Sequence, residues 1–157
     1  MNDELKVLLT IGSQLDKNNI PYMISGSMAA NYYTVPRMTR DIDIVVELKQ
    51  ADVDRFIKIF ETDFWIDSDT VSREVAGRGM FNVIHKECFI KVDFILRKET
   101  SFQESAFERC KKVVIENIPV WFIRLRRTPR LLVPRNAKHF WDLIPEIATR
   151  FLGTVDE

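Results

Sequence analysis

Hydrophobic residues recur at helical spacing in two parts of the chain. The first set predicts a helix that ends at Asn18-Asn19, and its members are Leu5, Leu8, Leu9 and Leu15. The second set follows the i, i+3, i+4, i+7 pattern, and its members are Val53, Phe56, Ile57 and Phe60. We expect a third, brief helix that Asp69 caps and that continues to Ala76.

Short apolar runs, rich in β-branched and aromatic residues, predict strands between these helices. The runs are 21–25, 40–46, 64–66, 80–85, 89–96, 113–115 and 120–123. The tight turn Lys86-Glu87-Cys88 is expected to join 80–85 to 89–96 as a hairpin, and Asn117-Ile118-Pro119 to join the last two runs. Strands interspersed with helices predict an α/β (α+β) fold with helices packed on a central sheet.

The strand 40–46 carries two acidic residues, Asp41 and Asp43, on one face. Side chains two apart share a face of a strand, so these carboxylates lie roughly 6.6 Å apart at the backbone while Ile42 and Ile44 point into the core. Two such carboxylates repel each other, and a hard cation such as Mg²⁺ relieves that repulsion. Asp93, expected late in its strand, is a candidate third ligand. The alternative is that all three are ordinary strand carboxylates.

Gly26-Ser27 follows the strand 21–25 and precedes the expected helix 28–33. Glycine allows a sharp turn and a close approach of ligand, and the free N–H groups of a helix start favour an anion such as a triphosphate. The alternative is an ordinary strand-to-helix turn. Arg37 and Arg40 are expected either to contact phosphate or substrate, or to orient the neighbouring carboxylates as ion pairs.

Other polar and aromatic residues carry weaker signals. Arg78 lies between two glycines, on a loop that could fold over a ligand. His85 and His139 stand alone in the sequence, which is more typical of structural or exposed histidines than of ligands. We expect the tyrosine, phenylalanine and tryptophan residues to lie in the core and not to form platforms that stack on bases.

The order of these motifs resembles the nucleotidyltransferase superfamily related to DNA polymerase β. The resemblance covers roughly residues 3–123 and is carried by Gly26-Ser27, a helix, Asp41-Ile-Asp43 and then Asp93. It is most similar to the minimal bacterial branch that includes the AbiEii-type toxins. The resemblance implies a mixed sheet of about five strands with helices on one side. It also implies transfer of a nucleotide from an NTP to a hydroxyl, and a role of this branch in toxin–antitoxin or phage-defence systems.

The resemblance also implies two Mg²⁺ ions, for which Mn²⁺ could substitute. Asp41 and Asp43 would hold both, Asp93 would share the second and take the acceptor proton, and Gly26-Ser27 would hold the β- and γ-phosphates. The acceptor could be an RNA such as a tRNA 3′ end, a partner-protein hydroxyl or a small molecule such as an aminoglycoside. The alternative function is a weak or inactive binding module of the same fold, as an antitoxin partner or a truncated relative.

Residues 124–157 differ from the first 123 and are expected to form a separate C-terminal extension. Residues 124–138 carry six arginines and lysines and no acid, and three of the six prolines fall in this extension. Three alternatives remain: a basic tail that binds an RNA acceptor, an irregular solvated extension, or sequence that follows a frameshift or truncation. We expect no packed helix there, and hence an open nucleotide pocket. The apolar surface left on the domain is then expected to be covered either by Phe140, Trp141 and Leu143 folding back or by a second copy of the chain in a homodimer.

Length and composition add few constraints. By its length of 157 residues the chain is expected to contain one domain, and a composition of 46% apolar and 29% charged residues is ordinary for a globular protein. The zero net charge does not indicate a nucleic-acid binder. Cys88 and Cys110 lack a metal-type spacing. With no signal peptide or membrane span expected, the predicted location is the cytoplasm.

Overall fold

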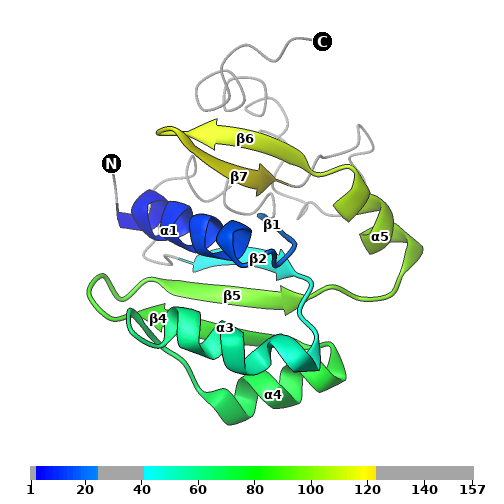
Figure 1. Cartoon of the computed structure of the whole chain (residues 1–157), viewed down its shortest axis with the longest axis horizontal. Coiled ribbons are helices and arrows are strands. Elements are labelled where there is room, and N and C mark those ends of the chain that lie inside the picture. The colour runs from blue at the N-terminus through cyan, green and yellow to red at the C-terminus, as the bar shows by residue number, and fades with distance from the viewer. Residues whose placement is uncertain (1–2, 25–40, 123–157) are drawn as a thin grey trace, which may run out of the picture.

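Seven strands form one mixed sheet in the computed structural model, which describes residues 3–24 and 41–122 (Figure 1). The strands are β1 (Tyr22–Ile24), β2 (Asp41–Val46), β3 (Phe64–Trp65), β4 (Met80–His85), β5 (Lys91–Leu96), β6 (Lys111–Ile115) and β7 (Ile118–Phe122). Their order is β3-β4-β5-β2-β1-β7-β6, in which the β5·β2 and β1·β7 pairs are parallel and the others antiparallel. The expected mixed α/β sheet is confirmed, but the expected number of about five strands is wrong.

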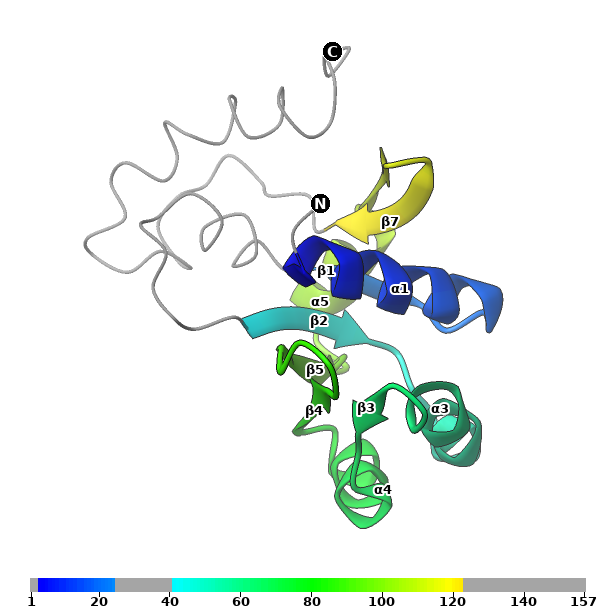
Figure 2. The ribbon, with the colours of Figure 1, turned by 90° about the vertical axis from the view of Figure 1, so that its left-hand side faces the viewer.

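The described helices are α1 (Asp3–Lys17), η1 (Gln50–Asp52), α3 (Val53–Phe60), α4 (Ser68–Gly77) and α5 (Ser101–Glu108). Figure 2 shows α1, α3 and α4 on the same side of the strands. The expected first and second helices are confirmed. The third helix begins two residues earlier than expected, because Asp67, not Asp69, is its N-cap and accepts a hydrogen bond from the Thr70 N–H.

The main core lies between the sheet and this helical layer. Ile42 and Ile44 of β2 are fully buried there, as the alternation of β2 predicts. The rings of Phe56 and Phe60 on α3 pack edge-on or tilted against Phe94 of β5, with centroids 5.1 and 6.0 Å apart. Each such buried ring contributes about 1.5–3 kcal/mol, so α3 fixes β5 and the residues it carries.

The opposite face of the sheet is covered at one end by α5. Met23, Val45 and Ile95 lie side by side on β1, β2 and β5 and contact Phe107 of α5. Helices therefore pack on both faces, and the expectation of helices on one side is wrong. The reason is that Phe107 buries an apolar patch that the alternation of β2 and β5 places away from the main core.

Both expected hairpins form, with turns that differ from those expected. The β4–β5 loop covers residues 86–89 and not only Lys86 to Cys88, since the His85 N–H donates to the Ile90 carbonyl. The β6–β7 turn is the pair Glu116-Asn117, whose φ angles of 49° and 65° fit a two-residue hairpin. Ile118 and Pro119 belong to β7.

In the part of the chain that the structure describes, no helix is long and apolar enough to cross a bilayer.

Candidate carboxylate site

Asp43 of β2 and Asp93 of β5 are direct partners in the parallel register. Adjacent strands lie about 4.8 Å apart, and both side chains point away from the core that Ile42 and Phe94 fill. Asp43 is half-buried and Asp93 is only 8% exposed. Asp93 is the third of six residues in β5, so the expectation that it lies late in its strand is wrong. The sheet therefore brings together two carboxylates that are 50 residues apart in sequence.

Lys91 supplies a positive charge that the sequence interpretation missed. Its Nζ lies 3.3 Å from Asp93 Oδ2, and its backbone is in register with Asp41. The signal was present, since Lys91 precedes Asp93 by two residues and side chains two apart share a strand face. A cationic side chain therefore already lies beside one of the two carboxylates.

Asn82 extends the pair into a row across three strands. It is the β4 partner of Asp93, and we name Asn82, Asp93 and Asp43 the carboxylate row. Residues in register on neighbouring strands share a face, so the exposed Asn82 amide lies on the face of the two carboxylates. An amide oxygen is a hard donor of the kind that Mg²⁺ and Ca²⁺ accept, and the row therefore offers oxygen donors from three strands.

The other predicted site residues lie wholly or partly outside the described residues. Only the backbone of Asp41 is described, and it places Asp41 two residues before Asp43 in β2. Gly26, Ser27, Arg37 and Arg40 all fall in 25–40. Their roles as phosphate ligands, like that of Asp41 as a metal ligand, stay predictions.

The register of β1 with β2 shows where the chain that leads to Gly26-Ser27 leaves the sheet. Ile24, the last residue of β1, is the antiparallel partner of Ile44, the neighbour of Asp43. The chain therefore leaves β1 at the end of the sheet that carries the carboxylate row. In the strand order, β1 and β4 lie on opposite sides of the β2–β5 pair.

The carboxylate row offers a divalent cation fewer ligands than it needs. Among residues 3–24 and 41–122, no group of three or more His, Cys, Asp or Glu side chains is close enough to hold a metal ion. Two carboxylates and an amide are all oxygen donors, and Mg²⁺ typically uses one or two carboxylates together with substrate phosphates. The described donors thus fit Mg²⁺ only when a phosphate completes the coordination.

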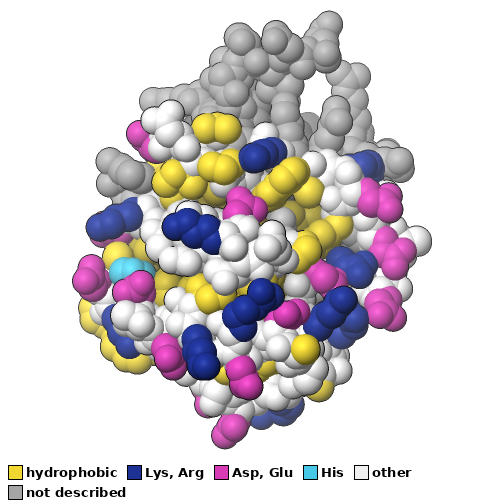
Figure 3. All heavy atoms as spheres, in the orientation of Figure 1, with side chains coloured by type: hydrophobic (Ala, Val, Ile, Leu, Met, Phe, Trp, Pro, Cys, Tyr) yellow, Lys and Arg dark blue, Asp and Glu magenta, His cyan; other side chains and the backbone are white. Residues whose placement is uncertain are grey.

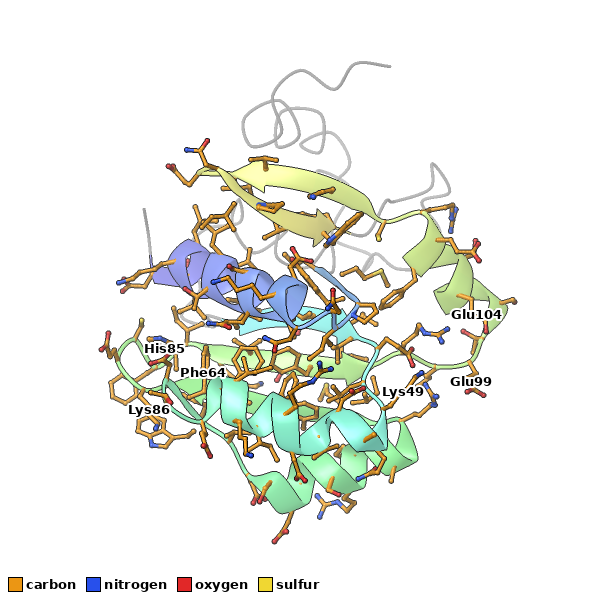
Figure 4. The ribbon with its side chains drawn as sticks, viewed as in Figure 1. Lys49, Phe64, His85, Lys86, Glu99 and Glu104 are labelled. Carbon is orange, nitrogen blue, oxygen red and sulfur yellow. The ribbon has the colours of Figure 1, made fainter. Side chains whose placement is uncertain are left out.

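Arg78 belongs to a separate ion-pair network at the other end of β5. It ends α4 with a left-handed φ of 49°, donates to the Arg97 carbonyl at 2.8 Å and pairs with Glu99 at 3.1 Å. Arg97 in turn pairs with Glu47 and Glu104. Figure 4 shows Glu99 and Glu104 at the opposite end of the sheet from His85 and Lys86. Arg78 therefore ties the end of α4 to the segment that follows β5. It does not lie on a loop that could fold over the carboxylates, as the sequence had suggested.

No protein-family model matches the chain, and no curated protein matches it. Two of the six solved chains that resemble the fold are as follows. One is an antigenic nucleotidyltransferase-like protein from Paracoccidioides brasiliensis, with 16% identity and a TM-score of 0.49 over 77% of this chain. This chain spans 60% of that protein's length. The other is the lincosamide antibiotic adenylyltransferase LnuA, solved with lincomycin bound, with 14% identity and a TM-score of 0.48 over 89% of this chain and 92% of LnuA. The expected AbiEii-type branch stays a prediction.

Proposed function

We propose that the protein is a Mg²⁺-dependent nucleotidyltransferase, which moves a nucleotide from an NTP to an acceptor hydroxyl. The observation that supports it best is the register of Asp43 with Asp93, two carboxylates on one face of adjacent strands. In the sequence, Gly26-Ser27 follows β1, and β1 ends beside Asp43. Two residues of chain span at most ~7 Å, so a phosphate held at Gly26-Ser27 would lie within reach of the carboxylates.

Each residue of the site has a part in this proposal. Asp41, Asp43 and Asp93 would hold the cation, and a cation there would offset the charge of the triphosphate and make the acceptor hydroxyl easier to deprotonate. The hydroxyl oxygen attacks the α-phosphorus, the bond from that phosphorus to the bridging oxygen breaks, and pyrophosphate leaves. Asp93 accepts the hydroxyl proton. The fixed sheet contributes positioning, because β2 and β5 pair over six consecutive residues.

One observation favours a second candidate, a binding module of this fold without catalysis. Lys91 already offsets the charge of Asp93, as a structural ion pair would. A carboxylate held by an ammonium group in every state would be a poor ligand and a poor proton acceptor. The two candidates therefore differ in whether Asp93 exchanges Lys91 for a cation when NTP binds.

Titration calorimetry with Mg²⁺ and each of ATP, GTP, CTP and UTP, followed by a transfer assay with labelled nucleotide, separates the two. The enzyme should bind at least one Mg²⁺–NTP and label an acceptor among RNA, protein and amino-sugar candidates. Asp43→Asn should abolish both, whereas Asp54→Asn, an exposed carboxylate on α3, should change neither. Binding without transfer to any acceptor supports the module, and equal binding by Asp43→Asn and wild type contradicts both.

A further inference from the structure

Trp65 and Phe89 form an exposed aromatic pair on the molecular surface. Their side chains are 51% and 69% exposed, and their ring centroids lie 5.6 Å apart. Our expectation that aromatic residues lie in the core is wrong for these two. Trp65 comes from β3, at the edge of the sheet, and Phe89 from the β4–β5 loop.

Phe89 occupies a backbone conformation that a bulky residue rarely adopts. Its φ is 57°, and its N–H donates to the His85 carbonyl at 2.9 Å, which closes the loop. Glycine or asparagine is the usual residue at such a left-handed position. Because the Phe89 ring is also mostly exposed, it recovers little burial energy in return. Backbone strain at a residue whose ring stays mostly exposed points to function.

The pair lies on the face of the carboxylate row. Trp65 is in register with Ile84 of β4, and Ile84 with Lys91 of β5, so the three share the face from which Lys91 reaches Asp93. Two strand spacings, roughly 10 Å, separate β3 from β5. The strand order puts the pair on the β4 side of the carboxylates, whereas Gly26-Ser27 follows β1 on the other side. If the triphosphate binds on the β1 side of the carboxylates, the acceptor must approach from the β4 side, where the aromatic pair lies.

The charges around the pair are acidic. On the flanking segments 61–67 and 85–91 the exposed acids are Glu61, Asp63, Asp67 and Glu87. Both lysines of these segments are engaged, since Lys86 donates to the Glu61 and Thr62 carbonyls at 2.7 and 3.0 Å and Lys91 pairs with Asp93. At the left margin of Figure 3, acidic, hydrophobic and basic side chains lie around the cyan histidine of the described surface. Single-stranded nucleic acid needs a positive groove beside its stacking rings, and these segments do not provide one.

We propose that Trp65 and Phe89 bind the ring of the acceptor, and that this acceptor is a small organic cation. The aromatic faces attract both a ring and a positive charge, and the surrounding carboxylates add to that attraction. The assignment to the acceptor rests on the proposed nucleotidyl transfer, whereas the binding of a ring-bearing cation does not.

The test uses three probes with similar rings and different charge: 2-phenylethylamine, 2-phenylethanol and 3-phenylpropionate. Binding to the full chain is measured by titration calorimetry for every variant, without metal or nucleotide. Where Trp65 is present, the NMR shift of its indole N–H reports whether the probe binds at this residue. The amine should bind most tightly and the carboxylate least. Phe89→Asn should weaken amine binding roughly tenfold, which is the scale of one lost cation–aromatic contact, and should raise the melting temperature because asparagine tolerates this backbone. Trp65→Ala should weaken amine binding similarly, and Val114→Asn, an exposed apolar residue of β6, should not.

Several results would overturn the proposal. Equal binding of the three probes would contradict the claim that the ligand is a cation. Unchanged amine binding by Phe89→Asn and Trp65→Ala would show that the amine does not bind at this pair. If Phe89→Asn lowers the melting temperature, Phe89 stabilises the fold and its backbone strain needs no functional explanation. Tighter binding of oligothymidylate at Trp65 assigns the pair to nucleic acid, and self-association that buries Trp65 assigns it to a second copy of the chain. None of these results depends on Asp43→Asn, so this inference and the nucleotidyl transfer can fail separately.

Discussion

Replacing Lys91 by methionine should destabilise the protein and make its stability depend more strongly on divalent cation. Lys91→Met keeps most of the aliphatic stem of the side chain and removes the ammonium group 3.3 Å from Asp93 Oδ2. The Asp93 carboxylate then loses its closest described cation while it remains in a buried position. A divalent cation bound at the carboxylate row would replace the lost charge.

The magnitude follows from the exposure of the two partners. The Lys91 side chain is 39% exposed and the Asp93 side chain 11%, so the pair lies between an exposed ion pair, worth about 0–1 kcal/mol, and a buried one, whose disruption costs about 3–5 kcal/mol. We expect Lys91→Met to lower the free energy of unfolding by about 1–2 kcal/mol. In a double-mutant cycle with Asp93→Asn, the two changes should cost about 1 kcal/mol less together than the sum of their separate costs.

Urea denaturation with and without Mn²⁺ measures both effects. In metal-free buffer the midpoint should fall for Lys91→Met, and Mn²⁺ should raise it more for Lys91→Met than for wild type, because the cation no longer competes with the ammonium group. Additive effects of Lys91→Met and Asp93→Asn would show that the ion pair has no energetic weight. An equal Mn²⁺ effect on wild type and Lys91→Met would show that no cation site includes Asp93.

Three further changes test other parts of the account. Gly26→Val should block NTP binding in calorimetry, by placing a branched side chain where the backbone must approach phosphate, and unchanged affinity in the folded variant refutes the phosphate role. Gly12→Ala should cost about 1–2 kcal/mol in urea denaturation, because the new Cβ would lie 2.8 Å from the Tyr22 hydroxyl and from Val120, whereas Gly77→Ala, with nothing within 4 Å, should be neutral or stabilising. Burial raises the pKa of Tyr22, and the charge of Asp16 adds to this. The stability that Tyr22 contributes is therefore present below its unfolded pKa of about 10 and is lost as pH rises above it, so Tyr22→Phe should flatten the fall in stability between about pH 9 and 11.

The sequence predicted the strand that carries Asp43 and the direction of its side chain, because alternation in β2 is unambiguous. Ile42 and Ile44 are buried as expected, and that fixes the face of the acids between them. The helix α3 was equally clear, since a four-residue apolar stripe needs a sheet to cover it. These are local patterns, and local patterns are what a single sequence displays.

The register between neighbouring strands could not be predicted from the sequence. A hairpin closed by three residues at Lys86 to Cys88 would pair Asn82 with Val92, and the true four-residue loop pairs Asn82 with Asp93. A slip of one residue moves a side chain to the other face of the sheet, so Asn82 could not be assigned to the site. The same loop explains Phe89, whose left-handed φ and exposure no apolar pattern predicts.

The prediction of about five strands was wrong for a different reason. The expected count of about five came from the resemblance, although the apolar runs themselves include the β6–β7 hairpin and the two-residue β3. Pairing of β7 with β1 extends the sheet to the seven strands observed, and only the three-dimensional structure shows that these runs join one sheet. The packing of α5 on the second face of the sheet also depends on tertiary contacts. Phe107 contacts residues that are far from it in the sequence, and local periodicity does not reveal such contacts.

Counting Mn²⁺ by its electron paramagnetic resonance signal, with and without a non-hydrolysable NTP analogue, tests the central claim most directly. We predict weak binding of Mn²⁺ alone by wild type and much tighter binding with the analogue, because phosphate oxygens complete the coordination that Asp43 and Asp93 begin. Asp43→Asn and Asp93→Asn should lose this coupling, and Asp54→Asn should keep it. If Asp43→Asn and Asp93→Asn bind Mn²⁺ with the analogue as wild type does, the carboxylate row is not the metal site and the proposed nucleotidyl transfer is contradicted.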